Sequence, residues 1–201
     1  MAVTRERFES GLTYEQWLAA MTKNKERFEQ NYQTATILPE DAAFFASLPE
    51  PLNVLVLAED WCGDVIANLP VLAKLAHAAN GKLLLRIFLR DQNLDIMDQY
   101  LYQGKFRSIP TFVFFDQHMN EVGRWMERPQ LARQEMDDGR SRFVTQHPEL
   151  PDADKPFQDM SEATRQVYAA SLSQFRAENA ARWAQAVVDE VRAVVTSGLR
   201  I

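Results

Sequence analysis

The chain has 201 residues and a single cysteine, which excludes a scaffold held by internal disulfides. Its formal net charge of −6 argues against a nucleic-acid binder, because such proteins rely on a basic surface. No apolar run approaches the roughly 18 residues of a membrane span, and the charged residues near the N-terminus are untypical of a secretory signal. We therefore expect a globular protein of the cytoplasm with neither a nucleic-acid nor a membrane partner.

The order of apolar runs and polar breaks predicts helices, then alternating strands and helices, then one long helix. Residues 13–48 show helical spacing, with Trp17 and Phe28 on the apolar face of a first helix, and a second short helix opens at Pro39. The Pro49-Glu50-Pro51 cluster ends that segment. An uninterrupted apolar run at 53–59 predicts a strand buried on both faces. The following elements are expected to be a helix at 64–79, a strand at 82–90, a short helix at 96–103, strands at 111–116 and 121–126, and helices at 129–146 and 159–197.

This β-α-β-α-β-β-α order predicts an α/β fold with a central mixed sheet flanked by helices, and additional helices at both ends of the chain. We assign residues 1–51 to an N-terminal helical extension, 52–147 to the α/β domain and 148–201 to a C-terminal helical extension. The last helix carries an apolar stripe that includes Tyr168, Phe175, Val187 and Val191. This stripe is expected to pack back on the α/β core.

The only cysteine, Cys62, lies between the end of the first strand and the start of the following helix. Unpaired N–H groups and the helix dipole stabilise a thiolate at such a position, and cysteines placed there can have pKa values of roughly 3.5–7.5. Three carboxylates, Glu59, Asp60 and Asp64, oppose this effect by like-charge repulsion. If these carboxylates are exposed, water and salt screen them, so we expect the helix to prevail.

Trp61-Cys62-Gly63 after a buried strand, together with Ile109-Pro110-Thr111 before the next, resembles the thioredoxin family. Pro70 in the helix after Cys62 and Gly123 in the hairpin also fit this family. The resemblance covers about residues 52–147, and the Trp-Cys-Gly-Asp form resembles a bacterial branch of the family. It implies a thioredoxin-like fold in which Pro110 is a cis-proline and the main chain of Ile109 lies beside the cysteine.

Two positions depart from the family pattern. Val65 stands where the resolving cysteine of the Cys-x-x-Cys motif belongs, and Val56 stands where many thioredoxins bury an aspartate used for proton transfer. With one thiol, the chain cannot release a mixed disulfide unaided. An unassisted dithiol reductase is therefore excluded.

The candidate catalytic residue is Cys62, as a nucleophile. The candidate substrate-binding residues are Trp61, Gly63, Asp64, Arg107, Ile109 and Pro110. Trp61 either shields the thiol and contacts a substrate or packs on the surface, and Arg107 either meets a ligand carboxylate or lies in a solvated loop. His77, His118 and His147 do not show metal-ligand spacing, so neither a metal nor a cofactor is expected beyond a small thiol acting as co-substrate.

The leading interpretation is thiol–disulfide exchange, in which Cys62 attacks a protein or low-molecular-weight disulfide and an external thiol resolves the mixed disulfide. Two alternatives stay open. One is a non-catalytic binding or scaffold module that retains the thioredoxin groove. The other is peroxide sensing, with Cys62 oxidised to a sulfenic acid.

Overall fold

The computed structural model describes residues 3–201, which divide into two compact units. The first contains the chain up to Arg128 together with Ala184–Ile201, and the second is Pro129–Trp183. These boundaries differ from the expected divisions at 51/52 and 147/148. The boundary at 51/52 is absent because N-terminal side chains such as Trp17 and Phe28 share one core with the sheet. The boundary at 147/148 is absent because the last helix, α8 (Glu162–Leu199), is continuous and contributes a part to each unit.

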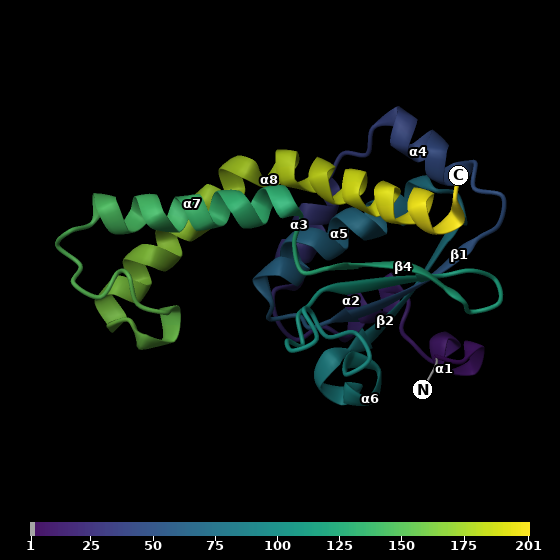
Figure 1. The fold of residues 1–201 in the computed structure, drawn as a ribbon, viewed down its shortest axis with the longest axis horizontal. Coiled ribbons are helices and arrows are strands. Elements are labelled where there is room, and N and C mark those ends of the chain that lie inside the picture. The colour runs from purple at the N-terminus through teal and green to yellow at the C-terminus, as the bar shows by residue number, and fades with distance from the viewer. Residues whose placement is uncertain (1–2) are drawn as a thin grey trace. The chain divides into compact units, whose positions relative to one another are not determined.

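The first unit is built on a four-stranded mixed sheet in the order β2-β1-β3-β4 (Figure 1). Its strands are β1 (Leu52–Ala58), β2 (Leu83–Leu89), β3 (Thr111–Phe115) and β4 (Glu121–Met126). β1 pairs with β2 in parallel and with β3 antiparallel, and β3 and β4 form an antiparallel hairpin. All seven residues of β1 are buried, which confirms the strand expected from the uninterrupted apolar run.

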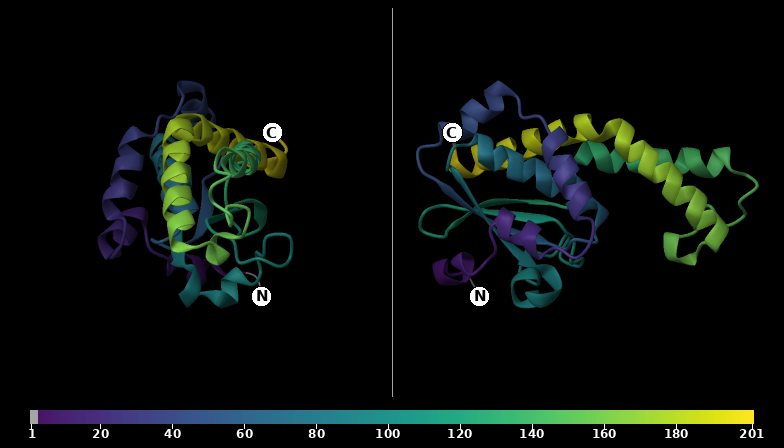
Figure 2. Two further views of the ribbon diagram at one scale, coloured as in Figure 1. Left: turned by 90° about the vertical axis from the view of Figure 1, so that its left-hand side faces the viewer. Right: turned by 180° about the vertical axis from the view of Figure 1, so that it is seen from behind.

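Helix α5 (Gly63–Ala78) follows β1 and packs against the sheet through a largely buried apolar face. Pro70 lies within it and has no N–H to donate to the carbonyl of Ile66, four residues earlier. The Asn31 side chain of α3 (Lys25–Thr34) donates to that carbonyl instead, at 2.7 Å. The proline therefore leaves an acceptor that helps attach α3 to α5, and the two helices lie side by side in Figures 1 and 2.

The N-terminal segment forms four helices rather than the two expected from sequence. They are α1 (Arg5–Glu9), α2 (Tyr14–Ala20), α3 and α4 (Pro39–Ala46). Asn24 has a left-handed conformation (φ 57°) and separates α2 from α3, so the spacing of Trp17 and Phe28 is not that of one helix. Their rings pack edge to face with their centres 4.8 Å apart, and this contact joins α2 and α3 in one core.

Between β2 and β3 the chain forms the 3₁₀ turn Arg90–Gln92 and the short helix α6 (Leu94–Met97). The helix expected at 96–103 is instead one turn at 94–97, and Gln103 and Gly104, which have positive φ angles, lie in a separate turn further along the loop. An isolated bridge between Tyr102 and Phe106 closes this turn. The resulting loop leads directly into the Ile109-Pro110 segment.

The C-terminal half of α8 packs on the first unit, as its apolar stripe predicts. Val187, Val191 and Val195 are buried in the core formed with the sheet. Gly123 in β4 permits this contact, because a Cβ there would lie 2.7 Å from the side chain of Val194. The side chain of Trp125, also in β4, donates to the carboxylate of Glu190 at 2.6 Å.

The second unit is a helical hairpin of α7 (Gln130–Gln146) and the N-terminal half of α8. Aromatic contacts join the two helices, with Phe143 on Tyr168 at 5.0 Å. Gly139 lies opposite Phe175, whose ring would be 3.3 Å from an added Cβ. Tyr168 and Phe175 of the apolar stripe therefore pack against α7, and the expectation that the whole stripe covers the α/β core is wrong for this half.

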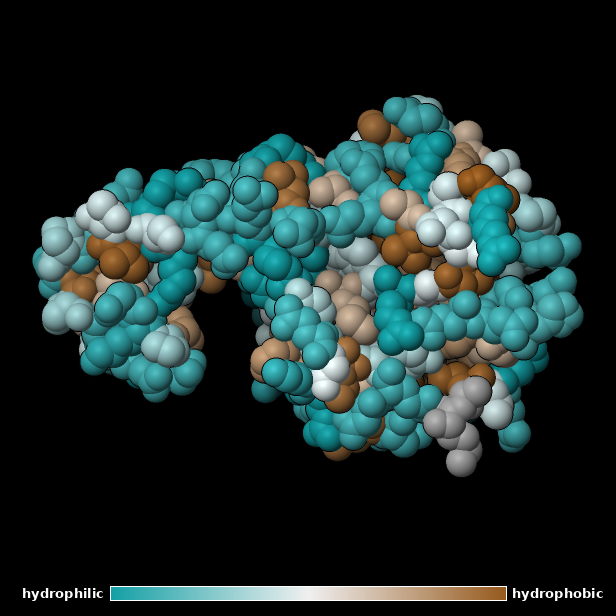
Figure 3. Space-filling model, viewed as in Figure 1, coloured by the Kyte–Doolittle hydropathy of each residue, from teal (hydrophilic) through white to brown (hydrophobic). Residues whose placement is uncertain are grey.

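Hydrophilic side chains dominate the face of the molecule seen in Figure 3, and hydrophobic residues form small separate patches. Within residues 3–201, no helix is both long and apolar enough to cross a membrane.

Candidate functional site

Cys62 occupies the junction between β1 and α5, where it is the N-cap residue of the helix. Its carbonyl accepts the N–H of Ile66 at 3.0 Å, so the helical hydrogen bonds begin at the cysteine itself. The residue is partly exposed. The first turn of α5 thus directs its unpaired N–H groups towards the region of the thiol, and such groups favour a thiolate.

The segment before β3 lies against this thiol. The Ile109–Pro110 peptide bond is cis, and Cys62 Sγ is 3.6 Å from the carbonyl oxygen of Ile109. In that contact the thiol donates to the carbonyl, which favours the protonated form and opposes the effect of the helix. The structure therefore brings Cys62 together with Ile109 and Pro110. Cys62 and Ile109, which make the contact, are 47 residues apart in the sequence.

The three carboxylates near Cys62 have different surroundings, since Glu59 is buried whereas Asp60 and Asp64 are half-buried, so screening by water and salt does not apply equally to all three. Glu59 is buried, because β1 continues into the core up to its end, and its carboxylate accepts the N–H of Asp91 at 2.9 Å. Burial raises the pKa of Glu59, and the Asp91 N–H partly offsets this. The Asp60 carboxylate accepts two backbone N–H groups of the N-terminal segment, from Thr22 at 3.2 Å and Lys23 at 3.0 Å.

Asp64, in the first turn of α5, forms an ion pair with Arg128. Their side chains are 13% and 20% exposed, so water screens this pair much less than a surface pair. The sequence interpretation did not include Arg128 in the site. Its only signal in the sequence is its place directly after the strand expected at 121–126.

Trp61 is 47% exposed, so its ring is available at the surface beside Cys62. The guanidinium of Arg90 lies over this ring, 5.0 Å from its centre, and cations are attracted to such faces. Arg90 also pairs with Asp91 at 2.8 Å and donates to the carbonyl of Arg107 at 3.3 Å. Arg90, which sequence reasoning missed, thus connects Trp61 with the loop before Pro110.

The side chain of Arg107 is directed to Asp98, with which it forms two hydrogen bonds at 2.7 and 2.9 Å. These bonds hold the pKa of Asp98 below its usual range. The backbone carbonyl of Arg107 therefore accepts from Arg90, while the Arg107 guanidinium bonds to Asp98 within the loop. Gly63 is the first residue of α5 and supplies backbone at the site.

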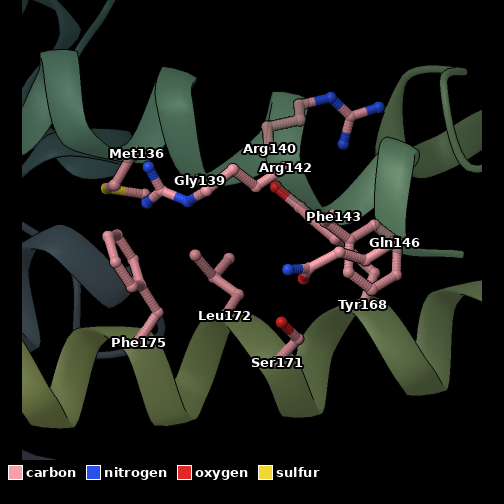
Figure 4. Close-up of a pocket in the computed structure, with 10 residues that line it drawn as sticks. All are labelled: Met136, Gly139, Arg140, Arg142, Phe143, Gln146, Tyr168, Ser171, Leu172 and Phe175. Carbon is pink, nitrogen blue, oxygen red and sulfur yellow. The ribbon is translucent and has the colours of Figure 1, made fainter.

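The second unit contains a small cavity of about 130 Å³ between α7 and α8 (Figure 4). Phe143, Tyr168, Leu172 and Phe175 line it together with Arg140. The Arg140 guanidinium lies over the Tyr168 ring and donates to the carbonyls of Ala153 and Lys155. These contacts are those of a helix pair and its connecting loop. Within residues 3–201, no group of three or more histidine, cysteine or acidic residues is arranged to hold a metal ion.

The comparisons with known proteins concern the family and the fold of the chain. A sequence model described as thioredoxin matches residues 11–140. A solved protein of unknown function from Pseudomonas aeruginosa is 18% identical, with a TM-score of 0.66 over 97% of this chain and 98% of that chain. An HIV epitope-scaffold is 17% identical, with a TM-score of 0.62 over 99% and 98% of the two chains.

No curated protein matches the chain. At these identities the solved structures share the fold, and the family match covers well over half of the sequence. It includes the Trp61-Cys62-Gly63 segment, the Ile109–Pro110 bond and all four strands. The chain belongs to the thioredoxin family.

Proposed function

We propose that this protein catalyses thiol–disulfide exchange with Cys62 as its only thiol. The observation that carries the proposal is the position of Cys62 Sγ, at the N-cap of α5 and 3.6 Å from the carbonyl of Ile109. The unpaired N–H groups of the helix favour a thiolate there. Cys62 is partly exposed, as a residue that reacts with an external disulfide must be.

The reaction has two exchange steps. In the first, the Cys62 thiolate attacks one sulfur of a protein or small-molecule disulfide. A bond from Cys62 to that sulfur forms while the substrate S–S bond breaks, and the second sulfur leaves as a thiolate. In the second, the thiolate of an external small thiol attacks the substrate sulfur of the mixed disulfide, and Cys62 leaves as a thiolate.

The protein itself undergoes no net redox change. The external thiol ends in a disulfide with the substrate sulfur, and protons are exchanged with water. The chain has one cysteine, so the second step requires a thiol from outside. We place the reaction in the cytoplasm, where small thiols are kept reduced, and we assign no cofactor besides that thiol.

The contact to Ile109 also supports a second candidate, a non-catalytic binding module. A thiol that donates to a carbonyl is stabilised in its protonated, unreactive form. The two candidates differ in the reactivity that they require of the folded protein, and this difference can be measured.

The test compares the folded protein with the chain in denaturant. At pH 6, the rate of mixed-disulfide formation with a small aromatic disulfide is followed by absorbance and mass. We expect folded Cys62 to react about tenfold faster than the unfolded chain, since more of it is thiolate. Adding a small thiol should then release the adduct, and Cys62→Ser should form none. A folded rate equal to or below the unfolded rate would overturn the proposal in favour of the binding module.

A further inference from the structure

The two residues that follow β4 contact both segments that surround Cys62. The Arg128 guanidinium donates to the Asp64 carboxylate at 2.5 Å, in the first turn of α5. The same nitrogen is 2.9 Å from the carboxylate of Glu127. One cation therefore lies between two carboxylates, in a part of the structure that water reaches poorly.

The backbone of Glu127 makes the second connection. Its N–H donates to the carbonyl of Pro110 at 2.7 Å, and its own carbonyl accepts from the side chain of Asn68 in α5 at 2.9 Å. Glu127 reaches these partners in a left-handed conformation, with φ at 68°. The end of β4 is thus bonded to α5 on one side and to the Ile109-Pro110 segment on the other.

We infer that Arg128 is a positioning residue for Cys62, which compensates the charge of Asp64 and fixes the first turn of α5 to the end of β4. Asp64 lies two residues after the cysteine, and its uncompensated charge would disfavour a thiolate. The effect of the partner is large where exposure is low, because screening is weak. The inference deepens the proposed function by naming a residue that governs the reactivity of its thiol.

Other charged groups also surround the cysteine. They are Glu59 and Asp60 before it, Lys23 in the N-terminal segment, Arg90 and Asp91 after β2, Arg107 with Asp98 before β3, and Glu127 after β4. A change at Arg128 leaves the other groups in place but removes the cation from Glu127 as well as from Asp64. The shift that it causes can therefore be assigned to Asp64 only by changing Asp64 as well.

The experiment measures the rate of Cys62 alkylation by iodoacetamide against pH. We expect Arg128→Met to raise the pH midpoint by about 0.5 to 1 unit, the size expected for one poorly screened charge near the thiol. Asp64→Asn in addition should return most of that shift, since it removes the charge that Arg128 compensated. Arg124→Met is the matched control, because Arg124 in β4 also pairs with a glutamate, Glu121, but lies outside the site. It should leave the midpoint unchanged.

A merely structural role would lower thermal stability without moving the midpoint, and Asp64→Asn would not reverse it. The inference is overturned if Arg128→Met leaves the midpoint within about 0.2 unit of the natural protein, or if the double variant is shifted as far as the single one. If Arg128→Met does not fold, Arg128→Gln carries the same expectation, because it can still donate to Asp64 but lacks the charge. Alkylation does not require exchange, so an unshifted midpoint and an absent exchange reaction are separate outcomes.

Discussion

Glu59 is a buried carboxylate between β1, whose residues are all buried, and Cys62. It lies three residues before the cysteine, and only 8% of it is exposed. Its carboxylate accepts the N–H of Asp91, while the guanidinium of the preceding residue, Arg90, lies over the ring of Trp61. A single turn after β2 therefore contacts both the residue that follows β1 and the tryptophan beside the thiol.

This position predicts a pH dependence of stability. Burial raises the pKa of Glu59 above its usual value of 4.5, so folding favours the protonated form. Its contribution to the free energy of unfolding is fully present below 4.5 and is lost as the pH rises through the raised pKa. Glu59→Gln keeps an oxygen for the Asp91 N–H and removes the charge. The variant should therefore gain stability relative to the natural protein between pH 4 and pH 7.

Urea unfolding at the two pH values checks this expectation. Glu50→Gln, at an exposed position of the loop before β1, is the matched control and should show no comparable change between them. An advantage of Glu59→Gln that shrinks as the pH rises would contradict the sign argued here.

Among the helices and strands, the sequence predicts an element best where its local pattern is compatible with a single type of secondary structure. The apolar run of β1 and the periodicity of α5 belong to this class, and the resemblance to thioredoxins located Cys62 and the Ile109-Pro110 segment. Helix α8 belongs to another class. Its apolar stripe is continuous, yet Tyr168 packs against α7 and Val191 against the sheet. Periodicity identifies a buried face but not the element that covers it.

The ion pair between Asp64 and Arg128 was beyond local patterns for a similar reason. The two residues are 64 positions apart and meet only because β4 ends beside the first turn of α5. Asp64 in a first helical turn has a sufficient local explanation in the helix dipole. Nothing in the sequence around Arg128 indicates which carboxylate it approaches.

The contact between α8 and β4 leads to a prediction about Gly198. An added Cβ there would lie 2.1 Å from the backbone carbonyl of Val122, which cannot move without distorting β4. In an unobstructed helix, glycine to alanine gains about 0.5–1 kcal/mol. We expect Gly198→Ala to lose about 1–3 kcal/mol instead, as overpacking does. Ser197→Ala, at the exposed neighbouring position, should stay within about 0.5 kcal/mol. Denaturant unfolding measures both, and a gain at Gly198 would contradict the contact.

At the scale of the whole molecule, the family match and the folding unit have different extents. The match ends at residue 140, whereas the unit built on the sheet includes Ala184–Ile201. This C-terminal segment contributes polar contacts as well as valines. Arg192 pairs at 3.0 Å with Asp41 of α4, which is only 3% exposed, and a buried carboxylate that loses its cation is strongly destabilising.

A chain that ends at residue 183 is therefore expected to lose the cooperative fold of the sheet unit. It would lack Val187, Val188, Val191 and Val195, all at most 1% exposed. Burial of such side chains contributes about 1.5–3 kcal/mol each, so their sum is comparable to the roughly 5–15 kcal/mol that stabilises a whole domain.

Near-ultraviolet circular dichroism and urea unfolding compare this chain with the natural one. The control is a chain cleaved at a protease site introduced within residues 150–155, which breaks the backbone but retains Ala184–Ile201. The cleaved chain should keep a cooperative transition, because every contact of the sheet unit is still present. If the shortened chain unfolds cooperatively at the same urea concentration as the natural protein, the C-terminal segment is dispensable and the unit is smaller than its contacts imply.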